Sequence, residues 1–484
     1  MRNLLVCVSL CVTQLNGQVV GTLHDGRDGK DYRTVRIGNQ WWMAENLNHK
    51  TRNGSLYYDN DGKTNSSTYG MLYDWNTAAT SCPNGWHLPS HEEWSYLEME
   101  LGFRPNEPVS GNNMYGRDEG GMLKEAGYSH WLAPNIGASN TTGFSALPGG
   151  HFSMNQFWGR NKVGHFWAGE KDSTSAWYRS VANNDARIHI FYQEKSNGYK
   201  SLRCVRDSII LTGRFMGQSS PGRLPKPFGL GIISRLGSNE HTVSFSPDGK
   251  EMYFTRDPDR KTFTVRSQDG EWTTPVPARF NGREAIFSPR GSRLLFGDGD
   301  IWFVKKKNDE WSSPQKFNSN INTEAYEFYA SMSDNGTLYF SRLENRHPSI
   351  FASQFRNGEY LEAMKLPAPI NLDSGNNFHP FISPDEDYLI FNSDRTGGFG
   401  DADLYISYKN KDGHWERPIN LGGKINSELR DICPTITPDG RFLFFTRNWE
   451  EDGKWQGDVY WVSTDFINEF KRQSPDIAKK TRRE

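Results

Sequence analysis

The second half of the chain repeats one pattern of apolar and polar residues. From about residue 236 onward, an apolar strand, a turn of the Ser/Thr-Pro-Asp-Gly type and a second apolar strand recur. In such a turn Pro presets φ, Asp tolerates the next position and Gly takes the left-handed one. Each copy therefore predicts a β-hairpin, and the copies begin at Val243, Ala285, Ala330, Pro380 and Pro434.

Further strands complete each repeat. A third apolar segment follows most of the hairpins, and a fourth begins near an aromatic residue after a glycine or acidic turn. Four strands per unit, at a period in the forties to fifties, are typical of β-propeller blades. One blade cannot bury both of its faces, so neighbouring blades must stack and the ring must close. We predict an all-β propeller over residues 228–466 with five blades; a six-bladed ring with one degenerate blade is the alternative.

The segments on either side of the repeats are expected to differ from them. The last copy stops after its third strand, at Ser463, so the missing outer strand must come from elsewhere. We expect it from the apolar segment 228–236, FGLGIISRL, which precedes the first copy. Residues 209–227 are rich in Pro and Gly and predict a linker. Residues 467–484 predict a polar, disordered tail.

The repeated phrases resemble a known group of propellers. The phrases FSPDGKEMYF and SDRTGGFGDADLYIS are similar to the WD-repeat-like repeats of TolB-like propellers in secreted bacterial proteins. The resemblance covers roughly half of the chain. It implies a propeller used for binding or scaffolding, and it fixes no partner.

In the first half, the stretch 82–94, CPNGWHLPSHEEW, predicts the start of a helix. Ser90 followed by Glu93 forms a capping box, and the apolar residues that follow recur at helical spacing. The stretch also suggests a metal site, but a zinc pair on a helix follows the pattern H-E-x-x-H. Because His87 and His91 lie on opposite sides of a proline and of the helix start, the metal site is disfavoured.

Motifs in a fixed order give this half a family resemblance. They are IGNQWWMAENLN from Ile37, YGMLYDWNTA from Tyr69, CPNGWHLPSHEEW from Cys82, TTGFSALPGG from Thr141 and LRCVRD from Leu202. In this order they resemble the Fibrobacter succinogenes major paralogous domain, here residues 18–208. The resemblance implies an α+β fold similar to C-type-lectin-like and formylglycine-generating-enzyme folds. Four tryptophans are then expected in the core, with stacking on a carbohydrate as the alternative: Trp41, Trp42, Trp75 and Trp86.

The same resemblance implies a disulfide between Cys82 and Cys204. Both cysteines match structural positions, so the copper chemistry of the oxidase members has no residues here. The loops at Asn106 and Asn183 only approach the calcium-binding pattern of sugar-binding lectins, so calcium-dependent sugar binding is not supported. No cofactor is predicted, and calcium stays a candidate ligand.

The N-terminus and the charge balance favour export. Arg2 precedes a short apolar run, and the small Gly17 follows, which predicts a signal peptide over residues 1–17. A first strand of the mature fold is the alternative, as is a lipid anchor at Cys11. Outside this segment three cysteines remain, so one pair and one single cysteine are expected. We expect a periplasmic, outer-membrane-associated or extracellular protein.

Composition excludes two classes of partner. Lys and Arg number 56 against 58 Asp and Glu, so no field of one sign indicates nucleic acid. No run of the mature chain approaches the roughly 20 apolar residues of a membrane-spanning helix.

Acidic and imidazole side chains fall just before the inner strand of several predicted blades. They would lie near one mouth of the central channel and could bind a cation or a polar ligand there. A solvated rim is the alternative, and Cys433 is expected to be a buried, inert thiol. The candidates are Glu240, His241, Glu284, Glu327, His379 and Asp431.

Two functions follow from this architecture. The first is an exported, non-enzymatic binding or scaffolding protein that recognises a cell-envelope protein or a glycan. The alternative is a polysaccharide lyase or hydrolase with its site in the propeller funnel, which would need convergent acid and base groups. No motif links the candidate residues, so no catalytic residue is assigned.

Overall fold

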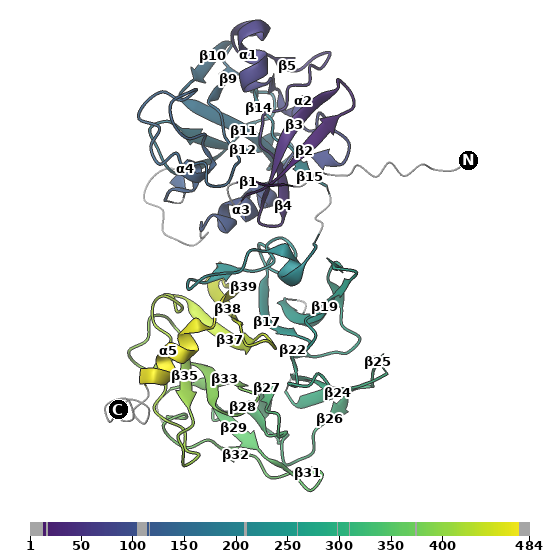
Figure 1. The fold of residues 1–484 in the computed structure, drawn as a ribbon, viewed down its shortest axis with the longest axis vertical. Coiled ribbons are helices and arrows are strands. Elements are labelled where there is room, and N and C mark those ends of the chain that lie inside the picture. Colours follow the sequence, from purple (N-terminus) through teal and green to yellow (C-terminus); the bar gives the residue numbers. More distant parts are fainter. Residues whose placement is uncertain are drawn as a thin grey trace, which may run out of the picture. The chain divides into compact units, whose positions relative to one another are not determined.

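The computed structural model describes residues 13–15, 18–103, 114–115, 117–207, 211–258, 260–297, 299–308, 310–372 and 375–473. The chain divides into two compact units, Met1–Ile210 and Leu211–Glu484 (Figure 1). Apart from residues 13–15, the predicted signal segment with Cys11 lies outside the described residues, as do Asn106 and the tail from residue 474. Among the described residues, no helix is both long and apolar enough to cross a bilayer.

Two sheets form the first unit. One is antiparallel throughout, with the order β1 (Thr13–Leu15), β2 (Gln18–Asp25), β3 (Lys30–Ile37), β4 (Gln40–Met43), β15 (Val205–Arg206) and β7 (Trp86–His87). The other has the order β5 (Ser55–Leu56), β6 (Leu72–Tyr73), β14 (Lys200–Ser201), β11 (Val163–Glu170), β12 (Ser175–Ala182), β13 (Ile188–Glu194) and β8 (Met114–Tyr115), with β9 (Gly149–Ser153) and β10 (Gln156–Arg160) alongside. The helical segments are η1 (Tyr58–Asn60), α1 (Gly62–Tyr69), α2 (Trp75–Ala78), α3 (His91–Glu100) and α4 (Glu119–Leu123).

Three of the four tryptophans singled out from the sequence belong to the core of this unit. Trp42 is fully buried and its ring centroid lies 4.8 Å from that of Trp94. Trp41 and Trp86 are also buried, and Trp75 donates its indole N–H to the Ala168 carbonyl at 3.0 Å. Trp41, Trp42 and Trp86 therefore pack inside the unit, whereas Trp75 is partly buried, and stacking on a carbohydrate stays a prediction.

The second unit is an all-β propeller of antiparallel sheets (Figure 1), and a parallel pair between Asn239 of the first sheet and Gly457 of the last joins these two at the ring closure. In chain order, the first sheet contains β17 (Asn239–Phe245), β18 (Glu251–Asp257), β19 (Lys261–Gln268) and β21 (Val276–Pro277), and the second contains β22 (Arg283–Phe287), β23 (Arg293–Gly297), β24 (Ile301–Lys307) and β26 (Gln315–Lys316). The third sheet contains β27 (Tyr326–Met332), β28 (Leu338–Glu344), β29 (His347–Ser353) and β32 (Met364–Lys365), and the fourth contains β33 (Asn377–Ile382), β34 (Tyr388–Ser393), β35 (Asp403–Tyr408) and β36 (Ile419–Asn420). The last sheet contains β37 (Arg430–Ile436), β38 (Phe442–Glu451), β39 (Lys454–Ser463) and, from earlier in the chain, β16 (Lys226–Pro227). Short extensions are η2 (Arg214–Gly217), β20 (Glu271–Trp272), β25 (Glu310–Trp311), β30 (Phe355–Arg356) and β31 (Glu359–Tyr360).

The last sheet takes its outer strand from ahead of the first, but not from the segment predicted. In β16, Lys226 pairs with Trp461 of β39. The predicted closing strand 228–236 instead forms turns. Gly229 has φ +63°, and a Cβ there would lie 2.5 Å from Ile233, so the chain bends sharply at a residue that must be glycine. The apolar residues that suggested a strand enter the core.

Two further predictions differ from the structure. Residues from Leu211 onward belong to the second unit and not to a linker, because Leu211, Phe215 and Met216 are buried in its core. The predicted polar tail begins with a helix, α5 (Asp465–Gln473). Its Ile467 is buried, and the Ile467 carbonyl accepts a hydrogen bond from Tyr408 at 2.7 Å.

A repeated polar contact, which we call the clamp, joins neighbouring sheets. Its centre is an arginine on or just after the second strand of a sheet. The arginine bonds the residue that opens the inner strand of its own sheet and the carbonyl of an isoleucine in the preceding loop. Arg342, for example, donates to Glu327 at 2.8 Å and to the Ile321 carbonyl at 2.9 Å.

The residue after the isoleucine completes the clamp. Asn322 exchanges hydrogen bonds with the backbone of Ile301, in the third strand of the preceding sheet, at 2.7 and 3.0 Å. The isoleucine and its neighbour thus tie one sheet to the next. The clamp recurs with Arg256, Glu240, Ile233 and Ser234, with Arg395, Asn377, Ile370 and Asn371, and with Arg447, Asp431, Ile425 and Asn426. Between β21 and β22 a stacked pair, Phe280 and Phe296, stands in its place.

The disulfide gives a first prediction. The structure joins Cys82 to Cys204 across 122 residues, and Cys433 is free and buried. Closing a loop of this length removes chain entropy from the unfolded state, worth about 5 kcal/mol in the chain-entropy model. Replacing both cysteines by serine should lower the free energy of unfolding of the first unit by this order. Mapping of non-reduced peptides should show the Cys82–Cys204 link, and a free Cys82 in protein from an oxidising compartment would contradict it.

His87 gives a second prediction. The capping box of α3 is present, and its Glu93 also contacts His87 Nε2 at 2.9 Å, while Asp207 contacts Nδ1 at 2.7 Å. The hydrogen bond with Glu93 raises the pKa of His87 from 6.5 to about 8. Because the folded-state pKa is the higher one, this stabilisation is complete below pH 6.5 and is lost as the pH rises through about 8. The stability difference between wild type and His87→Gln should therefore be larger at pH 6 than at pH 9, and a His87 NMR titration midpoint at or below 6.5 would refute this.

The clamp gives a third prediction. Glu327→Ala leaves the charge of Arg342 buried without its carboxylate, which typically costs about 3–5 kcal/mol. The matched control is Asp334→Ala, which breaks an exposed pair with Arg290 (3.5 Å) and should cost about 0–1 kcal/mol. Hydrogen exchange of peptides from β27 and β28 in increasing denaturant measures, for each variant, the loss in free energy of unfolding of the second unit alone. Equal, small losses in the two variants would show that the clamp does not hold the sheets together.

Candidate functional site

Each inner strand of the propeller carries a bulge at the same place. One residue there takes a left-handed backbone, with φ between 50° and 58°, and the strand register shifts around it. Such residues are rarely left-handed, and a bulge re-aims the side chain that it carries. The bulge residues are Thr242, Glu284, Tyr329, His379 and Cys433, each four positions before the Ser or Thr that opens the next turn.

The bulge residues meet one another in the middle of the ring. His379 Nε2 lies 3.6 Å from Glu284 Oε1, and His379 Nδ1 lies 3.4 Å from Cys433 Sγ. The Tyr329 ring packs on His379 with centroids 4.6 Å apart, and its hydroxyl donates to the Pro434 carbonyl at 2.7 Å. The inner strands thus bring one polar side chain after another from distant parts of the sequence to the same point.

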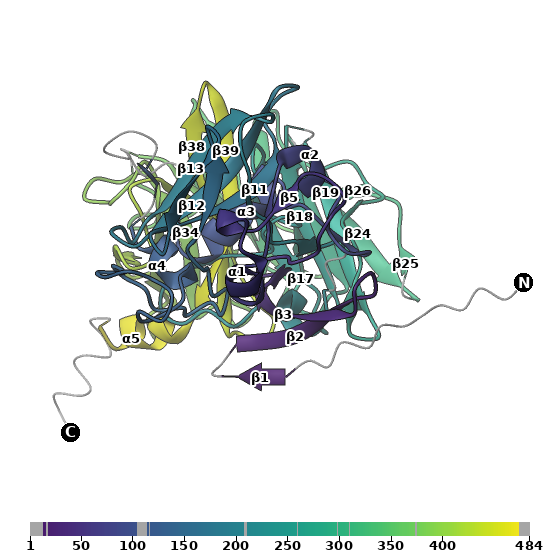
Figure 2. The ribbon, with the colours of Figure 1, turned by 90° about the horizontal axis from the view of Figure 1, so that it is seen from above.

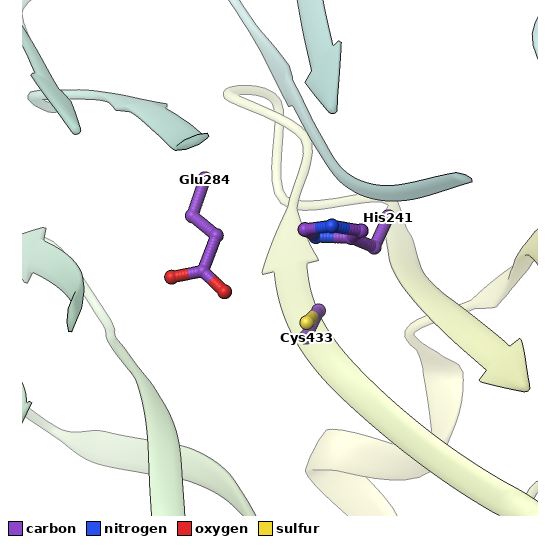
Figure 3. A group of neighbouring side chains, drawn as sticks. All are labelled: His241, Glu284 and Cys433. Atoms are coloured by element: carbon purple, nitrogen blue, oxygen red, sulfur yellow. The ribbon is translucent and has the colours of Figure 1, made fainter. Parts of the chain in front are cut away.

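The six candidate residues of the sequence fall into two groups. Glu240, Glu327 and Asp431 are fully buried and serve as the carboxylates of the clamp, so one oxygen of each is engaged by an arginine. His241, Glu284 and His379 are brought together at the bulges. Figure 3 shows the Glu284 carboxylate directed toward His241 and Cys433. Ligand binding by this second group stays a prediction.

A pocket of about 860 Å³ opens above these side chains. Its lining includes His241, Glu284, His379 and Cys433 at one end. The walls include the aromatic residues Phe328, Phe378 and Trp455 and the arginines Arg283 and Arg430.

The pocket walls are positively charged and aromatic. The Arg430 guanidinium lies 4.7 Å from the centroid of the Trp455 ring, and burial lowers the pKa of Arg430. Arg430 makes no side-chain hydrogen bond within the part of the chain that the structure describes. Arg283 is paired with Asp257 at 2.9 Å. Arg346 and Lys454 also line the pocket, and among these cations Arg430 is the one stacked on an aromatic ring.

The electrostatics of the bulge residues follow from their burial. Burial lowers the pKa of His379 although Glu284 opposes the shift, so the imidazole is neutral near pH 7. Burial would raise the pKa of Glu284, but the neighbouring His379 side chain and the charge of Arg283 lower it overall. Burial raises the pKa of the Cys433 thiol well above its usual range. The floor of the pocket thus holds a carboxylate, a neutral imidazole and a thiol.

Sequence reasoning did not find Arg430, Trp455 or the role of Cys433. The strands β38 and β39 contain 10 residues each, whereas the second strands of the other sheets contain 5 to 7. This longer hairpin, formed by β38 and β39 in Figure 2, contains Trp455, which lines the pocket. The signal was present as extra residues between the second and third strands of the last repeat. Cys433 could have been recognised by its position, because it lies four residues before Thr437, which opens the next turn, as the other bulge residues do in their repeats.

A second cluster, in the first unit, has a simpler explanation. Asp25, Asp28 and His49 bring donor atoms within 4.8 Å of one another. Both oxygens of Asp25 accept hydrogen bonds from Arg27, and Asp28 pairs with Lys30 at 3.0 Å. The cluster is thus part of an ion-pair network.

Comparison with known proteins supports the division into two units. The family model of the Fibrobacter succinogenes major domain matches residues 35–206. No curated protein matches the sequence.

Several solved structures are similar to the chain. TolB from Acinetobacter baumannii is 12% identical with a TM-score of 0.33, over 62% of this chain and 82% of that one. The Bacteroides ovatus xyloglucan PUL protein GH43B is 14% identical with a TM-score of 0.32, over 48% and 53%. XC5397 from Xanthomonas campestris, a gluconolactonase, is 11% identical with a TM-score of 0.28, over 51% and 96%. TM-scores this low carry no function over, so the propeller rests on its own sheet topology. The chain joins a segment that matches the Fibrobacter succinogenes major domain, residues 35–206, to an all-β propeller.

Proposed function

We propose that this protein is an exported, non-enzymatic binding or scaffolding protein of the cell envelope or surface, and that its ligand binds in the pocket at the centre of the propeller. The observation that carries the proposal is the Arg430–Trp455 pair in the wall of that pocket. A partly buried cation on an aromatic ring, without a carboxylate partner in the described structure, suits a ligand with an anionic group.

The proposal includes a finer description of both units. The helices beside the two sheets of the first unit suit an α+β, C-type-lectin-like domain. The four-stranded sheets of the second unit suit a five-bladed ring that β16 closes. The disulfide between Cys82 and Cys204 suits an oxidising compartment: the periplasm, the outer membrane or the cell exterior.

The unsatisfied polar atoms of the pocket indicate what else the ligand carries. In the described structure, four buried oxygens of lining residues accept no hydrogen bond: Asn239 Oδ1, Asp257 Oδ1, Asn448 Oδ1 and Gln456 Oε1. All four are acceptors, so they suit a ligand rich in hydroxyl donors. An acidic glycan offers hydroxyls, a carboxylate for Arg430 and an apolar sugar face for Trp455. Of the two partner classes, the pocket therefore favours a glycan over a protein.

The arrangement of carboxylates favours binding over glycoside hydrolysis. A hydrolase needs two carboxyl groups on either side of the scissile bond. Three of the predicted acids are held by the clamp arginines, and Asp257 is held by Arg283. Glu284 then lacks a second free carboxylate among the described residues of the pocket.

A panel of neutral and uronate-containing oligosaccharides tests the proposal on the full chain, with product analysis after incubation. We expect an acidic oligosaccharide to bind and to be recovered intact. Trp455→Ala and Arg430→Gln should each weaken binding by about tenfold, because a stacked or charge-paired group contributes about 1–2 kcal/mol.

The matched control is Trp158→Ala in the first unit. Trp158 is 45% exposed and Trp455 is 44% exposed, so both variants remove a similar indole surface. Loss of binding in Trp158→Ala alone would assign the ligand to the first unit. Cleaved products would replace the binding function by the enzymatic one, and binding of an envelope protein alone would overturn the choice of a glycan.

A further inference from the structure

Four metal-binding side chains meet at the floor of the pocket, and we call them the central cluster: His241, Glu284, His379 and Cys433. The donor atoms of His241, Glu284 and Cys433 all lie within 4.8 Å of one another (Figure 3). His379 Nε2 lies 3.6 Å from Glu284 Oε1 and 3.9 Å from Cys433 Sγ. The four residues come from β17, β22, β33 and β37, so only the closed ring brings them together.

These separations suit a single small ion. A tetrahedral ion with bonds of about 2.0–2.3 Å holds its ligand atoms about 3.3–3.8 Å apart. The 3.6 and 3.9 Å distances from His379 are already close to that range. The His241 donor lies within 4.8 Å of the donors of Glu284 and Cys433, so a rotation of the His241 side chain must bring it to coordinating distance.

A partner of His379 prepares its ring for coordination. His379 Nδ1 lies 2.9 Å from Asn392 Oδ1, an acceptor that holds the ring proton on Nδ1. Nε2 then carries a lone pair 3.6 Å from the Glu284 carboxylate. Both atoms can therefore coordinate the same cation. The same geometry is typical of metal sites, where an outer hydrogen bond fixes the tautomer of the ligating histidine.

His241 is held by several polar contacts. Its Nε2 lies 3.3 Å from Arg283 Nη2 and 3.4 Å from Asp257 Oδ2, and its Nδ1 lies 3.2 Å from the Thr242 hydroxyl. Coordination through either nitrogen displaces one of these contacts, and on the Nδ1 side the hydroxyl of Thr242 can rotate away.

We propose that the central cluster binds one borderline divalent transition metal ion of the zinc class. Imidazole and thiolate ligands prefer such ions, whereas calcium and magnesium require oxygen ligands, so calcium does not suit this position. Coordination forms a metal–sulfur bond and breaks the S–H bond of Cys433, whose proton leaves to solvent. The thiolate and the Glu284 carboxylate then neutralise the two charges of the ion.

The pocket provides the path for this ion. All four residues of the central cluster line the 860 Å³ pocket, although each is at least nine-tenths buried. The inference is independent of the ligand proposed above, because it concerns the floor of the pocket and not the Arg430–Trp455 wall.

Titration of the metal-free full chain with Co²⁺ tests the inference, because Co²⁺ occupies zinc sites and is coloured. We expect one equivalent to bind, with a near-ultraviolet thiolate-to-cobalt charge-transfer band that Zn²⁺ abolishes by displacement. Cys433→Ser should lose the band. Glu284→Gln and His379→Gln should keep it but weaken Co²⁺ binding at least tenfold, as loss of a site residue commonly does.

The control is His414→Ala, because His414 is an exposed histidine of the same unit and should leave the titration unchanged. The melting temperature of each metal-free variant shows whether it is folded. If Cys433→Ser is unfolded, the two glutamine variants still test the site. Absence of the charge-transfer band at excess Co²⁺ would overturn the inference. So would a band that persists unchanged in folded Cys433→Ser, or Co²⁺ affinity unchanged in both folded glutamine variants.

Discussion

The buried arginine of the clamp is the constraint on which the propeller depends. A guanidinium keeps its charge in every protein environment and carries donors in a rigid fork. Once buried, it needs a carboxylate or amide on one side and a carbonyl on the other. Arg342 finds these in Glu327 and Ile321, and the neighbouring Asn322 reaches back to the preceding sheet. One side chain therefore fixes both the internal register of a sheet and its junction with the next.

This fixed register decides where chemistry can occur. The residue bonded by the arginine opens the inner strand, and the bulge follows two positions later: Tyr329 follows Glu327, and Cys433 follows Asp431. The first position is needed by the scaffold, whereas the second faces its counterparts from other sheets. The side chains at the second position differ in every repeat, so the ring assembles a mixed set of donors from equivalent places.

The strands of the propeller could be predicted from the sequence, because the Ser/Thr-Pro-Asp-Gly turns and the apolar runs beside them have direct physical causes. The closing strand could not. Segment 228–236 is apolar because it enters the core, and Lys226–Pro227, which does pair with β39, is too short and polar to be recognised. Proline and glycine in residues 211–227 suggested a linker, but the few apolar side chains among them, such as Phe215, decide the packing.

The candidate site shows the same limit. The sequence placed polar residues at the start of the inner strands, but it could not separate Glu240, held by Arg256, from Glu284, two register positions further on. An alternating strand would have put both side chains on one face. The bulge breaks this alternation. A left-handed backbone cannot be predicted at a glutamate, tyrosine or histidine from the residue type alone.

That backbone is itself an argument for function at the channel. A non-glycine residue in the left-handed region costs of order 1 kcal/mol or more, and such strain persists only where the surrounding structure imposes it. Here Thr242, Glu284, Tyr329, His379 and Cys433 all carry it, at one level of the ring. The stabilisation from the clamps and from the closing strand β16 must therefore exceed the total strain of these five residues. A scaffold that holds strained polar side chains in mutual contact, with a pocket above them, has the rigidity that a preorganised binding site requires. The inner bulges are therefore where we expect the chemistry of this propeller, while the acids beside them maintain the ring.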